Sequence, residues 1–213
     1  MTHPDPWPLR HLVLRTPRLE LRPDDDAGLL ELVAEARRGV HPPERMPFVV
    51  PWTDDPPDRL GVETLRFHWL QRASVGPDDW PLNLLVRLDG RVIGSQGVHG
   101  THFAVVRSVL TGSWIGLRHQ GRGIGTEMRA AVLAFAFDHL GAVRARSGAF
   151  TDNLASLRVS ERLGYRRNGS EWVPRRGVPA EQVRLVVTPE TFVRPDWELE
   201  VDGLDACRPL LGL

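Results

Sequence analysis

The segment that most restricts the fold of this chain is the loop Gln120-Gly121-Arg122-Gly123-Ile124-Gly125. An apolar run that ends at Leu117 precedes it, and apolar residues at helical spacing follow it from Met128 onward. The first N–H groups of a helix have no partner within the helix, and glycines allow a ligand to approach the backbone closely. The sequence therefore predicts an anion-binding site, and the alternative is a tight glycine turn before an ordinary helix.

The glycine spacing limits the kind of anion. A dinucleotide fingerprint fails at its third glycine, because that position is Thr126 when counted from Gly121 and Met128 when counted from Gly123. All 27 residues counted as Lys or Arg are Arg, so the sequence excludes a Walker loop, a kinase-type lysine and a Schiff base. The pattern that remains is Gln-x-x-Gly-x-Gly, which is typical of loops that bind acyl-coenzyme A.

The rest of the chain predicts an α+β fold with one mixed, mostly antiparallel sheet flanked by helices. Asp89-Gly90 joins two apolar runs as a hairpin turn, and a third run, 105–117, is long enough to extend that sheet. We expect one domain over 1–213, with terminal extensions at 1–10 and 190–213. The further expected elements are strands near 12–14, 19–21, 143–150, 165–170 and 182–188, and helices near 24–38, 64–72, 126–140 and 153–163.

The segment 39–57 differs from the rest because it combines six prolines with large apolar residues. A loop this long and apolar either covers the core or borders a pocket. Trp52 within it is accordingly either a wall of a substrate pocket or a packed aromatic side chain.

Composition favours a globular protein that binds neither nucleic acid nor membrane. Hydrophobic residues make up 41% and charged residues 25%, the formal net charge is +0, and the arginines are scattered. No long apolar run occurs, and residues 1–8 lack the pattern of a secretory signal, so we expect a cytoplasmic location. The single cysteine, Cys207, can form neither an internal disulfide nor a cysteine-based zinc site, and we expect it to be packed.

Two motifs of the sequence are informative together. The first runs from Gly112-Ser113-Trp114-Ile115-Gly116-Leu117 through Thr126-Glu127-Met128. The second comprises Thr151-Asp152-Asn153-Leu154-Ala155-Ser156 and Arg162-Leu163-Gly164-Tyr165. Together they resemble the GNAT superfamily of N-acetyltransferases. The similarity covers about 12–188 and is greatest to the ribosomal-protein N-terminal acetyltransferases. It implies a sheet with two splayed central strands, with acetyl-CoA as co-substrate.

The resemblance also implies roles for individual residues. The backbone amides of the loop, from Gln120 through Gly121, Arg122, Gly123, Ile124 and Gly125 to Thr126, would bind the pyrophosphate, with charge added by Arg118 and Arg122. Ile115 and Leu117 would bond the pantetheine arm through their main chain, and Asn153 through its side chain. Ser156 would lie near the sulfur and donate a proton. The alternatives are that Asp152 or Asn153 simply caps a helix and that Ser156 faces solvent.

The general base stays unassigned. Many relatives carry a Glu two residues before the position of Gly112, where this chain has Leu110. His99, His102 and Glu63 are candidates by location, and water is another. His99 and His102 could also suggest a metal, but the intervening Gly100-Thr101 indicates a turn, so we expect no metal site.

The acceptor implied by the resemblance is a primary amine, on a protein N-terminus or a small molecule, with Trp52 and His99 as candidate substrate contacts. A succinyl-CoA donor and a non-catalytic acyl-CoA sensor remain alternatives. The family also suggests a homodimer, in which the apolar residues of 190–213 could pack on another subunit instead of on the domain.

Overall fold

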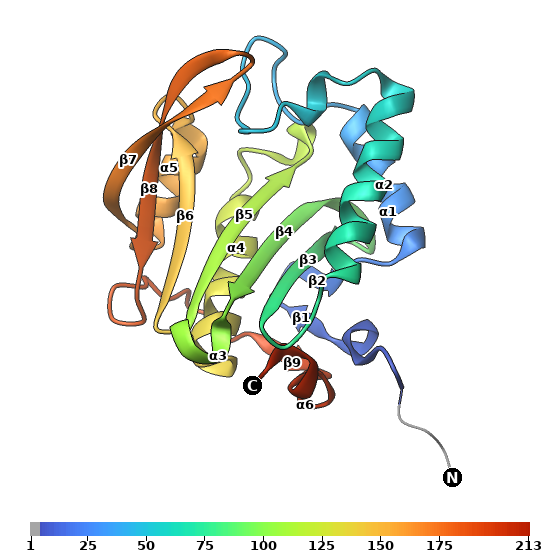
Figure 1. Cartoon of the computed structure of the whole chain (residues 1–213), viewed down its shortest axis with the longest axis vertical. Coiled ribbons are helices and arrows are strands. Elements are labelled where there is room, and N and C mark those ends of the chain that lie inside the picture. The colour runs from blue at the N-terminus through green and yellow to red at the C-terminus, as the bar shows by residue number, and fades with distance from the viewer. Residues whose placement is uncertain (1–4) are drawn as a thin grey trace.

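A computed structural model describes residues 5–213, so residues 1–4 of the predicted N-terminal extension lie outside the described part. One nine-stranded sheet with strand order β7-β8-β6-β5-β4-β3-β2-β1-β9 runs through it. Helices α1 and α2 cover one face of the sheet, and α4 and α5 cover the other (Figure 1). The expected α+β class, with a mixed and mostly antiparallel sheet, is confirmed.

The first half of the chain forms β1 (Val13–Arg15), β2 (Leu19–Pro23), α1 (Asp26–Arg37), α2 (Pro57–Ala73), β3 (Asp79–Leu88) and β4 (Arg91–Thr101), with 3-10 turns at Pro8–His11 and Trp52–Asp54. Helix α1 begins after Asp25, whose carboxylate accepts from the Gly28 amide at 2.6 Å. Side chains alternate along β3. Leu84 packs in the large core beneath α4, whereas Leu85 packs against α1. Both faces of this part of the sheet are therefore buried.

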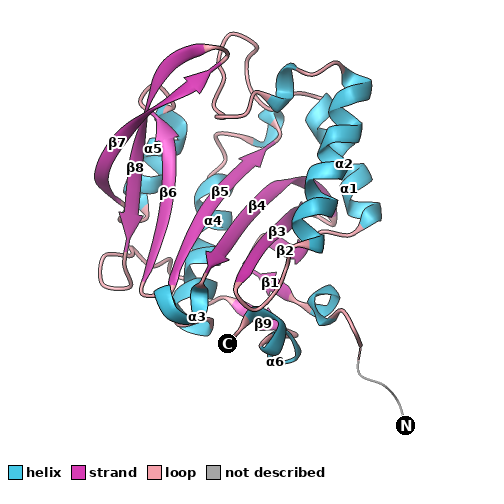
Figure 2. Ribbon diagram, in the orientation of Figure 1, coloured by secondary structure: helices cyan, strands magenta, loops and turns pink. Residues whose placement is uncertain are grey.

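The second half forms α3 (Phe103–Val106), β5 (Ser108–Ile115), α4 (Ile124–Ala134), β6 (Arg144–Phe150), α5 (Leu154–Arg162), β7 (Arg166–Arg175), β8 (Val178–Val187), β9 (Glu200–Asp202) and α6 (Leu204–Cys207). A 3-10 turn at Leu117–His119 lies between β5 and α4, a π-helical turn at Phe135–His139 ends α4, and a 3-10 turn at Pro209–Leu211 follows α6. Figure 2 shows α4 and α5 lying together on one side of the sheet.

Strands β5 and β6 are the only parallel pair in the sheet of the described chain, and they separate. Their register covers three pairs, from Ser108↔Arg144 to Leu110↔Arg146. Beyond these pairs β6 continues beside β8, while β5 stays paired with β4 and leans away from β6 (Figure 1). The splayed central strands that the resemblance implied are therefore present.

Several predicted boundaries were wrong. The run 105–117 becomes a strand only at Ser108, because His102 and Arg107 adopt left-handed backbone conformations on either side of the short helix α3. The closing hairpin is longer than predicted, since Arg176-Gly177 makes a tight turn with positive φ at both residues. Residues 200–202 pair with β1, so the C-terminal extension packs on the same domain. Cys207 is fully buried.

Gly164, at the end of α5, provides a test of the packing. Its φ is +84°, and a Cβ there would overlap the carbonyl oxygen of Thr191. Gly141 has a similar φ of +73° but open space around it. We expect Gly164→Ala to destabilise the protein by about 1–3 kcal/mol more than Gly141→Ala, because both incur backbone strain but only the first creates a clash. Urea unfolding measures the difference, and equal losses would contradict the packing described.

Candidate active site

The loop between β5 and α4 has free amide donors. Gly121 and Gly123 have φ of 75° and 77°, which turns the chain into the helix. The amides of Thr126 and Glu127 both donate to the Gly123 carbonyl at 3.1 Å. Within the described part of the chain, the five amides of 121–125 have no acceptor. A helix N-terminus with unpaired N–H groups favours a bound anion.

A buried carboxylate holds the start of this loop. Glu35 of α1 is 0% exposed, and its oxygens accept from Nε and Nη2 of Arg118 at 3.0 and 2.5 Å. Arg38 donates to the same carboxylate at 3.2 Å. A Cβ at Gly116 would overlap Glu35, so the carboxylate requires a glycine at that position. The sequence did not reveal Glu35, since it lies in an ordinary helical pattern 83 residues before its main partner.

Gln120 makes a second link between the loop and the end of α1. Its side-chain Nε2 donates to the carbonyls of Val40 and Ile115 at 2.8 and 3.1 Å. The Leu117 amide donates to the Gly39 carbonyl at 2.9 Å. The Leu117 N–H is therefore used inside the protein, which leaves the main-chain carbonyl of Leu117 for the predicted contact with a pantetheine arm. Gln120 thus orders the loop through its side chain.

Arg118, which we expect to add positive charge near the pyrophosphate, also makes a contact inside the protein. Its guanidinium forms an ion pair with Glu35, and this contact raises the pKa of Arg118. The same carboxylate also pairs with Arg38, and the ion pair of Arg118 fixes the start of the loop. Arg122 is exposed, and none of the ion pairs in residues 5–213 includes it.

Arg18, in the turn between β1 and β2, is a cation beside the loop that the sequence analysis missed. Its Nη1 donates to the Arg122 carbonyl at 3.1 Å, and a Cβ at Gly123 would lie 3.6 Å from Nη2. Its Nε donates at 2.6 Å to Glu127, in the first turn of α4. Glu127 is 8% exposed and also accepts from Thr16 at 2.6 Å. No local pattern places Arg18 here, because 109 residues separate it from Glu127.

Main-chain groups of β5 face the gap between β5 and β6. Gly116 donates to Ile93 at 2.9 Å, and bonded and non-bonded pairs alternate along an antiparallel ladder. The amides of Ser113 and Ile115 are therefore directed away from β4, toward the gap. At the start of the gap, the Ser147 hydroxyl donates to the Thr111 carbonyl at 3.1 Å, where a ladder bond would otherwise lie. Ile115 keeps the orientation that its expected role requires.

Asn153 and Ser156 lie at the N-terminus of α5. The Asn153 Oδ1 accepts from the Ser156 amide at 3.2 Å, so Asn153 does cap the helix. Its Nδ2 and the Ser156 hydroxyl have no hydrogen-bond partner in residues 5–213. Asp152 is not the cap: it pairs with Arg175 at 2.8 Å, which lowers the pKa of the Asp152 carboxyl. Capping by Oδ1 leaves the amide donor of Asn153 free for another ligand.

The opposite face of the sheet carries the candidate acceptor residues. The register places Leu110 opposite His99 and Gly112 opposite Gly97, so these side chains share the face covered by α1 and α2. Leu110 is 46% exposed, and a Cβ at Gly112 would meet nothing within 4 Å. The exposed surface at Leu110 and Gly112 is bordered by Trp114, whose ring lies 5.3 Å from that of Trp52.

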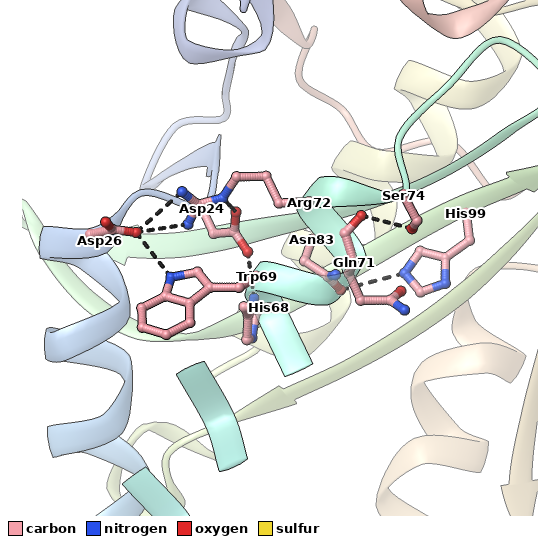
Figure 3. A network of polar contacts seen from close by, with 9 residues as sticks. All are labelled: Asp24, Asp26, His68, Trp69, Gln71, Arg72, Ser74, Asn83 and His99. Atoms are coloured by element: carbon pink, nitrogen blue, oxygen red, sulfur yellow. Dashed lines mark hydrogen bonds and ion pairs between the residues drawn. The ribbon is translucent and has the colours of Figure 1, made fainter. Parts of the chain in front are cut away.

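Trp52 and His99 thus both lie near this exposed surface. Trp52 is on the side of Trp114, and His99 is on the side of Leu110. Trp52 packs on Phe48 as well as Trp114, so it is a packed aromatic residue at the border of the open surface. His99 lies 3.4 Å from the Asn83 Oδ1, close to the end of α2 (Figure 3). Burial lowers the pKa of His99 to about 4, so its imidazole is neutral at pH 7.

The other candidate bases are less well placed. Glu63 pairs with Arg66 on α2 at 3.2 Å. His102 is exposed and precedes α3 with φ of 47°. In the neighbouring His68–Asp24–Arg72 network in Figure 3, the imidazole and the carboxylate are buried, and the network joins α2 to the residues just before α1. In residues 5–213 no group of three potential ligands is arranged to hold a metal, and no helix there combines the length and apolarity of a membrane span.

Comparison with known proteins agrees with this geometry. The acetyltransferase (GNAT) domain family matches residues 12–166. The probable N-acetyltransferase YjcK of Bacillus subtilis (strain 168) is 30% identical over 96 residues, which are 43% of this chain and 51% of that protein. The chain thus matches about half the length of that curated relative.

Two solved structures have the same fold. Mycobacterium smegmatis RimJ, in complex with CoA-disulfide, has a TM-score of 0.66 at 22% identity and covers 86% of this chain and 90% of its own. RimL, a ribosomal L7/L12 alpha-N-protein acetyltransferase in complex with coenzyme A, has a TM-score of 0.65 at 16% identity, covering 81% and 95%. The ribosomal-protein branch named from the sequence is therefore among the structural neighbours.

Splayed parallel strands beside a helix N-terminus with free amides define, together with these matches, the class of acyl-CoA-dependent N-acetyltransferases. The chain belongs to the GNAT acetyltransferase family.

The depressed pKa of His99 predicts a pH effect on stability. Between pH 6.5 and about 4 the unfolded state binds a proton at this residue that the folded state does not. The free energy of unfolding should fall as the pH is lowered through this range, by up to about 3 kcal/mol from this group. His99→Gln should remove that part of the pH dependence in urea titrations at several pH values. His11→Gln, at an exposed ring, is the control, and equal pH profiles for wild type and His99→Gln would contradict the burial argument.

Proposed function

We propose that the protein transfers an acetyl group from acetyl-CoA to a primary amine by direct attack on the thioester. The observation that carries this proposal is the set of free amides at 121–125, at the N-terminus of α4 and next to the gap between β5 and β6. A pyrophosphate offers the negative charge and acceptor oxygens that such a terminus binds. Arg122 adds a cation to this site, and Arg18 lies beside it.

The gap between β5 and β6 suits the thioester. The free amides of Ser113 and Ile115 can donate to the pantetheine arm and to the thioester carbonyl, and the Asn153 Nδ2 can donate to the same arm. As the amine nitrogen bonds to the carbonyl carbon, negative charge grows on the carbonyl oxygen, and a fixed N–H donor stabilises it. The C–S bond then breaks, and the sulfur leaves as a thiolate.

Two protons must move for the atoms to balance. The attacking nitrogen loses one to a base, and the departing thiolate gains one from an acid. We assign the acid to the Ser156 hydroxyl, which is free of other partners and lies in the first turn of α5. Water is the base that we favour, because Leu110 occupies the position where relatives have a carboxylate and His99, with a pKa of about 4, is a weak base.

The acceptor would bind on the face that carries Leu110 and Gly112, between Trp52 and His99. A protein N-terminus is one acceptor class, supported by the likeness to RimL, which acts on an α-amino group of a ribosomal protein. A small-molecule amine is the other. We also propose a cytoplasmic location and a homodimer, which sedimentation would test.

A second candidate function is a non-catalytic sensor of acyl-CoA, favoured by the absence of a carboxylate at Leu110. Thiol release from acetyl-CoA across a panel of amines and N-terminal peptides distinguishes the two. Turnover supports the enzyme, whereas tight binding of acetyl-CoA with no thiol release for any amine would support the sensor.

Removing the proposed acid should slow the chemical step. We expect Ser156→Ala to lower kcat by about 100-fold with little change in KM for acetyl-CoA, because the hydroxyl acts mainly on the leaving thiolate. Steady-state kinetics by thiol release measures both constants. Leu154→Ala, at an exposed residue in the same helical turn, is the matched control. An unchanged kcat in Ser156→Ala would remove this residue from the mechanism.

Filling the loop should abolish coenzyme binding. Gly123→Trp would place an indole where the phosphates are expected, whereas Gly123→Ala adds one methyl group and has the same backbone strain at φ of +77°. We expect the Trp variant to bind CoA at least about 100-fold more weakly than the Ala variant in calorimetry, with similar melting temperatures. Equal affinity of the two variants would reject the loop as the phosphate site.

A further inference from the structure

Arg129, in the second turn of α4, is a buried cation with no anionic partner. It is 5% exposed, and it is the one arginine in residues 5–213 with a buried side chain. Its Nη1 donates to the Ser160 hydroxyl and its Nη2 to the Ser113 hydroxyl, both at 3.0 Å. Its Nε has no partner, and no carboxylate in the described part of the chain pairs with it.

This arrangement is unfavourable in the free protein. Moving a charge out of water without a counterion costs much more free energy than two hydroxyl contacts recover. Burial lowers the pKa of Arg129, yet a guanidinium remains charged at neutral pH. The nearby Tyr165 does not supply an anion, because burial raises its pKa and its hydroxyl lies 2.9 Å from Thr111. A ligand that brings a negative charge would remove this cost.

The position of Arg129 relates it to the proposed thioester site. Ser113 lies on β5 three residues after Leu110, the last residue that pairs with β6, so the guanidinium contacts β5 where this strand has separated from β6. Ser160 lies one turn after Ser156 on α5, and its hydroxyl donates to the Ser156 carbonyl at 3.0 Å. Arg129 therefore connects the strand and the helix that border the expected reacting sulfur.

The other arginines near the site have no comparable free charge. Arg118 is paired with Glu35, and Arg18 is paired with Glu127. Arg122 is exposed beside the loop, where the phosphates are expected. A second anionic group on the donor, separate from the phosphates, would thus have one buried cation available to it.

We propose that Arg129 binds a carboxylate at the end of the acyl chain, so that the site accepts the CoA thioester of a short dicarboxylic acid such as succinate. This inference rests on the proposed acyltransferase function and replaces acetyl-CoA with the CoA thioester of a dicarboxylic acid as the preferred donor. The chemistry is otherwise unchanged. The amine nitrogen bonds to the thioester carbon and loses a proton, the C–S bond breaks, CoA leaves and takes up a proton, and the amide product keeps the free carboxylate.

The test compares three ligands, namely CoA, acetyl-CoA and succinyl-CoA, by calorimetry on wild type and Arg129→Met. Wild type should bind succinyl-CoA about 10- to 100-fold more tightly than acetyl-CoA, which is the range for a charge-assisted hydrogen bond to a desolvated carboxylate. Arg129→Met should lose this preference while its affinity for CoA changes little. Arg122→Met is the matched control, and it should weaken all three ligands by the same factor.

The outcomes separate the two levels of the proposal. Equal binding of acetyl-CoA and succinyl-CoA by wild type, or an equal loss of all three ligands in Arg129→Met, would overturn the role of Arg129 and leave the acyltransferase function intact. Failure of wild type to bind any of the three would overturn both. Arg129→Met should be at least as thermally stable as wild type, because it removes a buried unpaired charge. Should it not fold, the wild-type comparison and Arg129→Lys still decide the matter, since the Lys variant retains the charge and should retain part of the preference.

Discussion

The buried carboxylate of Glu35 is the interaction on which the geometry of the site depends. It fixes Arg118 at the start of the loop and requires a glycine at 116, so the backbone after β5 follows one path. Gln120 adds bonds to the end of α1. Contacts with α1 and with the residues just after it thus fix the start of the loop. The five amides that follow remain unpaired, and the cost is low at Gly121, Arg122 and Gly123, which are exposed at the start of a helix.

Charges around the site follow one rule with one exception. Glu35 and Glu127 are buried acids, and each is paired with an arginine that holds a distant part of the chain against the loop. Such pairs order the loop more than they stabilise the fold, since the cost of desolvating the ions offsets much of their attraction. Arg129 is the exception, because its buried guanidinium donates hydrogen bonds only to the hydroxyls of Ser113 and Ser160. An unfavourable interaction of this kind is more readily understood at a binding site than in a core.

The two faces of the sheet separate the proposed binding side of the acyl donor from that of the amine acceptor. Strand β5 directs Ser113 and Ile115 amides into the gap, places the Ser113 side chain on the α4 side with Arg129, and directs Leu110 and Trp114 to the side of α1 and α2. Alternation along one strand therefore separates the donor side from the acceptor side, and the gap connects them. The packed Trp52 and the neutral His99 lie on the acceptor side, away from the phosphates.

Local patterns in the sequence determined those elements that can be recognised from residues close together in the chain. These are the hairpin at Asp89-Gly90, the helix after the glycine loop, the loop itself and the pair Asn153 and Ser156, which together identified the family. The predicted limits failed where a non-glycine residue adopts positive φ, as at Arg107 and Arg176, because composition alone gives little sign of that conformation.

Only the tertiary structure decided which distant side chains meet at the loop. Glu35, Arg18 and Arg129 lie in ordinary helical or turn sequences, and their partners are between 16 and 109 residues away. Contacts over such separations arise from the packing of whole elements, which no local periodicity encodes. The sequence by itself thus determined the chemistry of the loop, whereas the fold decided which charges surround it and which of them remains unpaired.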